Sequence, residues 1–293
     1  MKYSAYELAT YAFDPLHAFW ENEKTQRAVA GALIACFIAA LLGIELGRHG
    51  LLPAAIAAKT PTSHYAAVGI AFTLVLVLEV ISLIFVLPCS FSKSVGKQFE
   101  ILCLILMRNS FKELVNFPEP ISFTGNMTPI YQILSDGVGA FAVFVLLGIY
   151  YHIQKPGRPL KPSFKFSYVA SKKLVALLLL GLFAGLGAYD FYLISKGRHA
   201  FDFFSTFYTV LIFSDILLVL ISQRYLPTFH AVFRNSGFAL VTLLIRLALA
   251  SPPFYNAALG VVSAAFAVLL TLAYNSFYGA GQGTKSPQLP PES

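Results

Sequence analysis

The chain is poor in charged residues and in cysteine. Only 12% of its 293 residues are Asp, Glu, Lys or Arg, against about 25% in a soluble globular domain. The three cysteines, Cys36, Cys89 and Cys103, show no CxxC spacing and therefore indicate neither a disulfide framework nor a zinc site. They fall in or beside apolar segments, and we expect them to be packing residues.

Motifs of soluble enzymes are also lacking. The sequence contains no HExxH, no nucleophile elbow and no phosphate-binding glycine loop. The segments between its apolar stretches are too short to hold a soluble catalytic domain. We therefore expect no enzymatic activity, no cofactor and no metal.

Hydrophobic residues dominate, at 57% of the chain, and the mean hydropathy is +0.70. Unbroken apolar runs such as residues 174–183 exclude the alternating pattern of a membrane β-barrel. A helix needs about 20 apolar residues to cross a hydrocarbon core about 30 Å thick. The sequence thus predicts an all-α polytopic membrane protein, which we expect in the inner membrane of a bacterium. The formal charge of +7 does not point to nucleic acid, because the basic residues lie in short loops.

About eight transmembrane helices are predicted from the apolar stretches. Their approximate bounds are residues 28–46, 66–88, 99–117, 129–152, 174–195, 203–222, 232–250 and 254–277.

Segments outside these helices complete the expected organisation. Residues 1–26 are polar but rich in aromatics, which favours a helix lying at the membrane interface; the alternative is a loosely ordered tail. A basic cytoplasmic linker at 154–173 would join a membrane unit at 27–153 to a second unit at 174–278. Residues 279–293 are rich in Gly, Pro and polar residues, which predicts a disordered tail.

The two units share an order of rare charged residues. The matching positions are Glu45 and Asp190, each followed by a Gly-Arg-His sequence, then Glu79 and Asp215, then Arg108 and Arg246. Apolar helices resemble one another by chance, but charged residues within them do not recur so easily. We interpret the chain as two parallel four-helix repeats.

Charge distribution gives the orientation. With eight helices, fourteen of the 21 Lys and Arg residues fall on one side and five on the other, with Arg108 and Arg246 inside the bilayer. Both termini are then cytoplasmic. The weakest crossing is 99–117, whose second half is polar. If that segment lay along the interface, the second unit would be inverted and would carry Arg224 and Arg234 away from the cytoplasm, so the charge rule favours eight crossings.

Charged residues within the apolar segments are the candidate functional residues. An ionised group at the bilayer centre costs about 2.5–3.5 kcal/mol on insertion scales, so such groups face partners or water. Glu79 and Arg108 lie at comparable depth on adjacent helices, as do Asp215 and Arg246, and we predict that each pair interacts. One interpretation is a proton or ion pathway through the pairs. The other is that each acid neutralises its arginine and fixes helix register.

Two helix faces carry predictions about packing. A polar face at i, i+4 spacing is predicted to point into the protein; it consists of Glu100, Leu104, Arg108 and Lys112. Gly181 and Gly185 form a small-xxx-small pair, which permits close contact with another helix.

A third set of acids, Glu45, Asp136 and Asp190, is predicted near the outer surface. Asp136 stands in a Ser-Asp-Gly-Val-Gly stretch that interrupts the apolar helix with small and polar residues. We interpret the set as the lining of an outer vestibule.

Two functions from different classes are compatible with these features. The first is a transporter or channel for protons, small ions or a small polar solute, in which Glu79→Gln or Asp215→Asn abolishes flux. The second is a non-catalytic accessory subunit of a larger membrane complex, in which the same changes alter stability or assembly. The bilayer is the expected partner, with a second copy or other membrane chains as further candidates.

Overall fold

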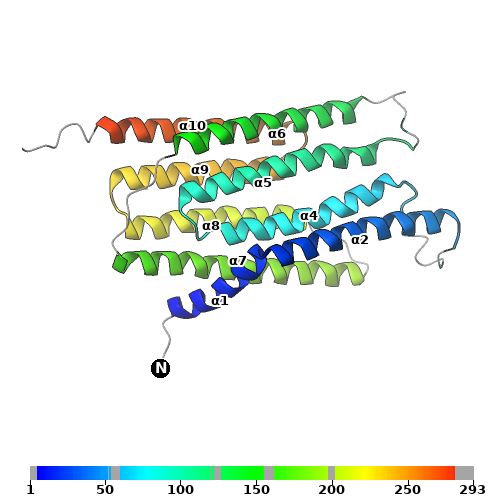
Figure 1. The fold of residues 1–293 in the computed structure, drawn as a ribbon, viewed down its shortest axis with the longest axis horizontal. Helices are drawn as coiled ribbons and strands as arrows, with labels where there is room; N and C mark the ends of the chain where they lie inside the picture. The colour runs from blue at the N-terminus through cyan, green and yellow to red at the C-terminus, as the bar shows by residue number, and fades with distance from the viewer. Residues whose placement is uncertain are drawn as a thin grey trace, which may run out of the picture.

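The computed structural model describes residues 5–51, 53, 60–119, 121, 127–154, 162–196 and 202–280. Within these ranges all regular structure is helical, with no strand (Figure 1). The elements are α1 (Ala5–Glu21), α2 (Glu23–Arg48), α4 (Tyr65–Val86), α5 (Phe91–Lys112), the short 3-10 helix η1 (Glu113–Asn116), α6 (Thr128–Ile153), α7 (Pro162–Ser195), α8 (Phe203–Tyr225), α9 (Phe229–Ala250) and α10 (Tyr255–Ala280).

Seven of these helices are long and apolar enough to cross a membrane: α2, α4, α6, α7, α8, α9 and α10. The chain is accordingly a helical membrane protein. Helix α5 is not among the seven, because it carries Lys93, Lys97, Glu100, Arg108 and Lys112. It nevertheless lies within the bundle and has the same length as α9, 22 residues (Figure 1).

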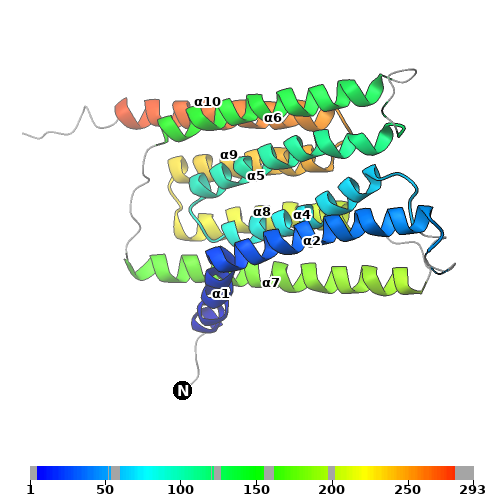
Figure 2. The same ribbon diagram turned by 45° about the vertical axis from the view of Figure 1, so that its right-hand side comes forward.

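Successive helices run up and down an elongated bundle (Figures 1 and 2). The α4–α5 and α8–α9 turns lie at one end, here called the inner end after the predicted orientation. The opposite end, where α5 and α9 finish, is called the outer end. Helix α5 packs on α9 and α6 packs on α10, and each of these pairs runs in the same direction. This arrangement is what parallel repeats would produce, while the duplication itself stays a prediction.

The bundle has two buried apolar clusters. One lies where α5, α6, α9 and α10 meet, and the other joins α1, α4, α7 and α8. In the first cluster α6 and α10 approach very closely, because a Cβ added to Gly139 would lie 2.6 Å from Cβ of Ala257. The absence of a side chain at Gly139 is what allows this contact between the two halves.

Helix α2 stays at the periphery. Helix α7 packs on α1, α4 and α8, whereas α2 packs mainly on α4 and α1, and only 6% of its most apolar window is buried. The close contact predicted for Gly181 and Gly185 is wrong within this chain, since neither has an atom within 4 Å of a Cβ placed on it. The opposite face of α7, with Val175, Leu179 and Phe183, is the one that packs.

Helix α7 begins at Pro162, so the second part of the expected linker is helical. Lys172 is 1% exposed, and its Nζ donates to the carbonyl of Cys89 at 2.8 Å. The ammonium lies 4.4 Å from the ring centroid of Phe91 and 4.7 Å from that of Tyr168. This lysine fastens the α4–α5 turn to the second half, and its contacts explain why the helix continues here in place of a loop.

The N-terminal segment forms helix α1, set obliquely to the bundle (Figure 2). Phe13 is buried against Phe85 of α4, and Asp14 pairs with Lys173 of α7 at 2.6 Å. The opposite side exposes apolar side chains such as Tyr11 and Phe19, as an interfacial helix would. The tail predicted at 279–293 lies outside the described residues, except for residues 279 and 280 in α10. Of the cysteines, only Cys103 is buried, whereas Cys36 and Cys89 are exposed, so the packing role holds for one of three.

Candidate ion pathway and its acid and arginine pairs

The first pair links the two helices of the α4–α5 hairpin. Glu79 comes from α4, and its Oε1 lies against Nη1 of Arg108 from α5. The two helices are antiparallel, and the pair joins Glu79, beyond the middle of α4, to Arg108, near the outer end of α5. The glutamate side chain is 10% exposed and the arginine side chain 30% exposed. One member of the pair is therefore still in contact with its surroundings.

The second pair links α8 and α9, and its arginine is sealed from the surroundings. Nε of Arg246 lies 3.6 Å from Oδ2 of Asp215, which makes an ion pair but is too long for a hydrogen bond. Arg246 is 0% exposed, and its three guanidinium nitrogens find no hydrogen-bond partner among the described residues. The Thr242 side chain lies within hydrogen-bonding reach of Asp215. The structure thus brings both predicted pairs together, in different surroundings.

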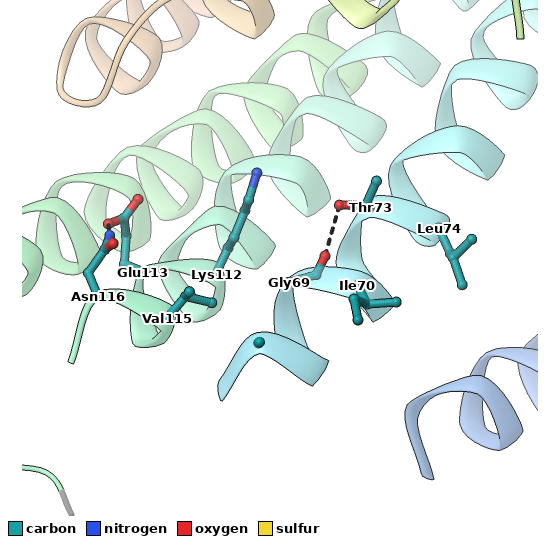
Figure 3. A pocket seen from close by; sticks show the side chains of 9 residues that line it. Gly69, Ile70, Thr73, Leu74, Lys112, Glu113, Val115 and Asn116 are labelled. Carbon is teal, nitrogen blue, oxygen red and sulfur yellow. Dashed lines mark hydrogen bonds between the residues drawn. The ribbon is translucent and has the colours of Figure 1, made fainter. Parts of the chain in front are cut away.

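Three cavities follow one another along the α4–α5 hairpin. The first, of about 240 Å³, extends from Trp20 and Gln26 at the α1–α2 corner to Glu79 and Arg108. The second, of about 30 Å³, also touches Glu79 and Arg108 and reaches Thr73 and Lys112. The third, here called the outer pocket, has about 500 Å³ and shares Thr73 and Lys112 with the second (Figure 3). The first pair stands where the two deeper cavities meet.

The α8–α9 hairpin has a simpler groove of about 190 Å³. Asp215 and Ser236 line it, together with the outward-facing Ile216 and Leu240. Arg246 is not among its lining residues. Only the acid of the second pair therefore borders open space.

The polar face of α5 does not point into the protein, so that prediction is wrong. Leu104 is 49% exposed and Lys112 is exposed. The other side of α5 packs on α6 and α9 through residues such as Phe99, Leu102 and Leu106. Because the apolar side drives that packing, the polar side turns toward α2 and the surface, where it lines the row of cavities.

Glu45 takes part in a network at the outer end that the sequence did not indicate. One ring nitrogen of His64 lies 2.9 Å from Oε2 of Glu45, and the other lies 2.7 Å from Oε1 of Glu119. The backbone N–H of His64 also donates to Glu119 Oε2 at 3.1 Å. Arg48 pairs with Glu119 at 3.6 Å, and His49 with Glu45 at 3.0 Å. The network ties the end of α2, the start of α4 and the segment after η1 together.

The charged groups in this network shift each other's pKa values. The hydrogen bond to Glu119 raises the pKa of His64, because it favours the protonated ring. The same bond holds the pKa of Glu119 below its usual value. The two carboxylates favour the protonated form of the ring, while Arg48, whose Nη1 lies 3.1 Å from Nδ1 of His64, opposes it.

The other two predicted vestibule acids lie elsewhere. Asp136 is 2% exposed within α6, where its carboxylate bonds with Asn256 of α10 and Oδ1 has no further partner in the described chain. Asp190 lies near the outer end of α7, and the Gly-Arg-His sequence after it is outside the described residues. Glu45, Asp136 and Asp190 thus occupy three separate environments, on α2, α6 and α7.

Sequence reasoning missed several of these residues. His64 and Glu119 lie in connections, where lone charged residues are ordinary, and only their partner Glu45 stood in a repeated motif. Lys172 looked like one basic residue of a linker, although Tyr168 one turn earlier and the apolar run after it are signals of a helix. In the sequence, the polar residues of the outer pocket's rim appeared only as the polar second half of the predicted membrane helix 99–117.

In the described ranges no group of three or more His, Cys, Asp or Glu side chains is placed to hold a metal ion. No protein-family model, no characterised protein and no solved structure matches the chain. Together the fold and the pairs define a helical membrane protein with charged pairs between its helices.

Proposed function

We propose that this protein is a transporter or channel that moves protons, small ions or a small polar solute along the α4–α5 hairpin. One observation carries the proposal: Glu79 and Arg108 both line the two deeper cavities and stand where these meet. An ion pair at such a junction blocks the passage while it is closed and offers charged groups when it opens.

The narrowest point supports a small permeant. The middle cavity has about 30 Å³, the share of one water molecule in liquid water. A proton, a water or a small ion passing there would meet both members of the pair, in which Arg108 neutralises Glu79 at rest. Passage requires the arginine to release the carboxylate, and the exposure of Arg108 leaves room for that movement.

In this proposal α5 is the eighth crossing, and both termini are cytoplasmic. The position of α5 beside α6 and α9 and its length of 22 residues support the assignment of α5 as a membrane crossing. Its polar side is tolerated because it borders the cavities and α2. The sealed pair of Asp215 and Arg246 then serves to hold α8 against α9.

Proteoliposome flux tests the pathway. The purified chain is reconstituted, and proton and monovalent-ion fluxes are measured for wild type, Glu79→Gln and the matched control Glu100→Gln. Glu100 lies on the same polar side of α5 but lines none of the three cavities. We expect Glu79→Gln to lose at least tenfold in flux and Glu100→Gln to keep it. Wild-type flux no greater than that of empty vesicles would refute the proposal.

A second candidate, an accessory subunit, is favoured by a different observation. Gly31 and Gly43 on α2, and Gly181 and Gly185 on α7, have open space where a side chain would be. Small residues on outward faces let another membrane helix approach closely. Extraction in mild detergent followed by analysis of co-purifying chains tests this role. Other chains in fixed ratio would favour it, and a lone chain or homo-oligomer would favour transport.

A further inference from the structure

We propose that the outer pocket binds one phospholipid whose head group carries both a phosphate and a primary ammonium. The pocket lies between the first half of α4 and the end of α5 with η1 (Figure 3). This site goes beyond the proposed flux and stands whether or not the protein transports anything.

The walls of the pocket suit an acyl chain. Ala66, Gly69, Ile70, Thr73 and Leu74 line it from one face of α4, at the i, i+3, i+4, i+7, i+8 spacing of a helical stripe. Ile70 is 45% exposed and Leu74 38% exposed, so this stripe faces the surroundings of the bundle. Gly69 leaves the floor open, since a Cβ there would meet only Val115 at 3.6 Å.

The depth of the pocket suits a head group. Helix α4 begins at Tyr65 and helix α5 ends at Lys112, so the pocket occupies the outer end of the bundle. Lysine and polar side chains at helix ends lie at the level of lipid head groups. A lipid seated here would place its phosphate near Lys112 and its chain along Ile70 and Leu74.

The rim presents one cation beside one anion. Lys112 lies between the two helices, with Glu113 and Asn116 next to it (Figure 3). Lys112 forms no ion pair in the part of the chain that the structure describes. Oε2 of Glu113 accepts from Nδ2 of Asn116 at 2.6 Å, which leaves Oε1 for another donor. The rim therefore offers a donor to a phosphate and an acceptor to an ammonium.

This pairing of charges selects the lipid. A phosphatidylethanolamine head group satisfies both sides, with its phosphate at Lys112 and its N–H donors at Glu113. Phosphatidylglycerol has no cation to meet Glu113. Phosphatidylcholine has a quaternary ammonium without N–H donors, so it would leave Oε1 of Glu113 without a hydrogen bond.

Native mass spectrometry of the full chain in detergent tests the site. Dioleoyl phosphatidylethanolamine, phosphatidylglycerol and phosphatidylcholine are titrated separately onto delipidated protein. We expect one phosphatidylethanolamine per chain, bound at least fivefold more tightly than either of the other two. Equal binding of the three lipids, or tighter binding of phosphatidylglycerol, would overturn the proposal.

Three variants locate the site, and a fourth variant serves as the control. Lys112→Gln and Glu113→Gln should each remove the preference for phosphatidylethanolamine, and Gly69→Leu should fill the pocket and remove the single bound lipid. Lys93→Gln makes the same change at the exposed inner end of α5 and should behave as wild type. Preference kept in Lys112→Gln, Glu113→Gln and Gly69→Leu would place the lipid elsewhere. Flux is measured on the same preparations, so a failure of lipid binding and a failure of transport appear as separate results.

Discussion

The α4–α5 and α8–α9 hairpins each hold an acid and an arginine in a pair, but the surroundings of the two pairs differ. In both, an acid on the first helix pairs with an arginine that stands four residues before the end of a 22-residue second helix. Around Arg108 there are cavities, while Arg246 is fully buried. The difference follows from the neighbours, because α2 covers the first hairpin only loosely. The corresponding pair thus borders cavities through both of its members in the first half, and through the acid alone in the second.

Removing one arginine at a time tests this contrast most strongly. We expect Arg246→Met to lose about 3–5 kcal/mol of folding free energy, because it leaves the buried Asp215 without its counter-charge. Arg108→Met should lose less, about 1–3 kcal/mol, since Glu79 borders cavities that admit water. Unfolding in mixed micelles with increasing SDS measures both.

A double variant is the control for that experiment. Arg246→Met combined with Asp215→Leu removes both charges and should recover most of the loss. Equal losses for the two arginine variants would mean that the hairpins are not differently sealed.

A substitution at the contact between α6 and α10, where the two halves meet, should give the next largest loss of stability. Gly139→Ala should cost about 1–3 kcal/mol, because its Cβ would lie 2.6 Å from Cβ and 3.2 Å from Cα of Ala257. Gly148→Ala is the control on the same helix, where a Cβ meets nothing within 4 Å. Thermal unfolding in detergent compares them, and equal stability of the two variants would show that α6 and α10 are not in close contact.

Lys172 binds the inner turn of the α4–α5 hairpin through the carbonyl of Cys89, and this contact distinguishes that turn from the α8–α9 turn. Lys172→Met should cost about 1–2 kcal/mol by leaving the Cys89 carbonyl without its charged donor. The turn after α4 should also loosen, which a faster alkylation of the exposed Cys89 would report. Lys173→Met is the control, because its partner Asp14 is largely exposed. An unchanged alkylation rate in Lys172→Met would mean that the lysine does not hold this turn.

The smallest effect concerns pH and the His64 network at the outer end of the first half. The raised pKa of His64 means that its contribution is complete below about pH 6.5, its unfolded pKa, and is lost as the pH rises through the folded value. The lowered pKa of Glu119 has the opposite sign, so its contribution is present above about pH 4.3 and is lost on further acidification. The network should be strongest in mildly acidic solution.

Melting temperatures of wild type and His64→Gln between pH 5.5 and pH 9 measure this dependence. We expect the difference to be largest at the acidic end and to shrink as the pH rises. His230→Gln removes an exposed histidine at the inner end and should show no such trend. A constant difference for His64→Gln would contradict the protonated form of the network.

Much of the fold was accessible from local patterns. Each apolar stretch predicted as a helix lies mostly within one, although α5 covers Phe91–Lys112 where 99–117 was predicted, and both acid and arginine pairs meet. The errors concern helix faces: the polar side of α5 and the glycine pair on α7. Each depended on which distant helix would cover a given side.

The sequence by itself determined that this is a helical membrane protein and that its rare charged residues pair between neighbouring helices. The reason is that hydrophobicity and the cost of a buried charge act residue by residue. Only the tertiary structure decided that α7 packs on both α4 and α8 while α2 stays outside. That arrangement leaves Arg108 beside cavities and Arg246 fully buried, and it follows from side-chain packing between segments far apart in the chain.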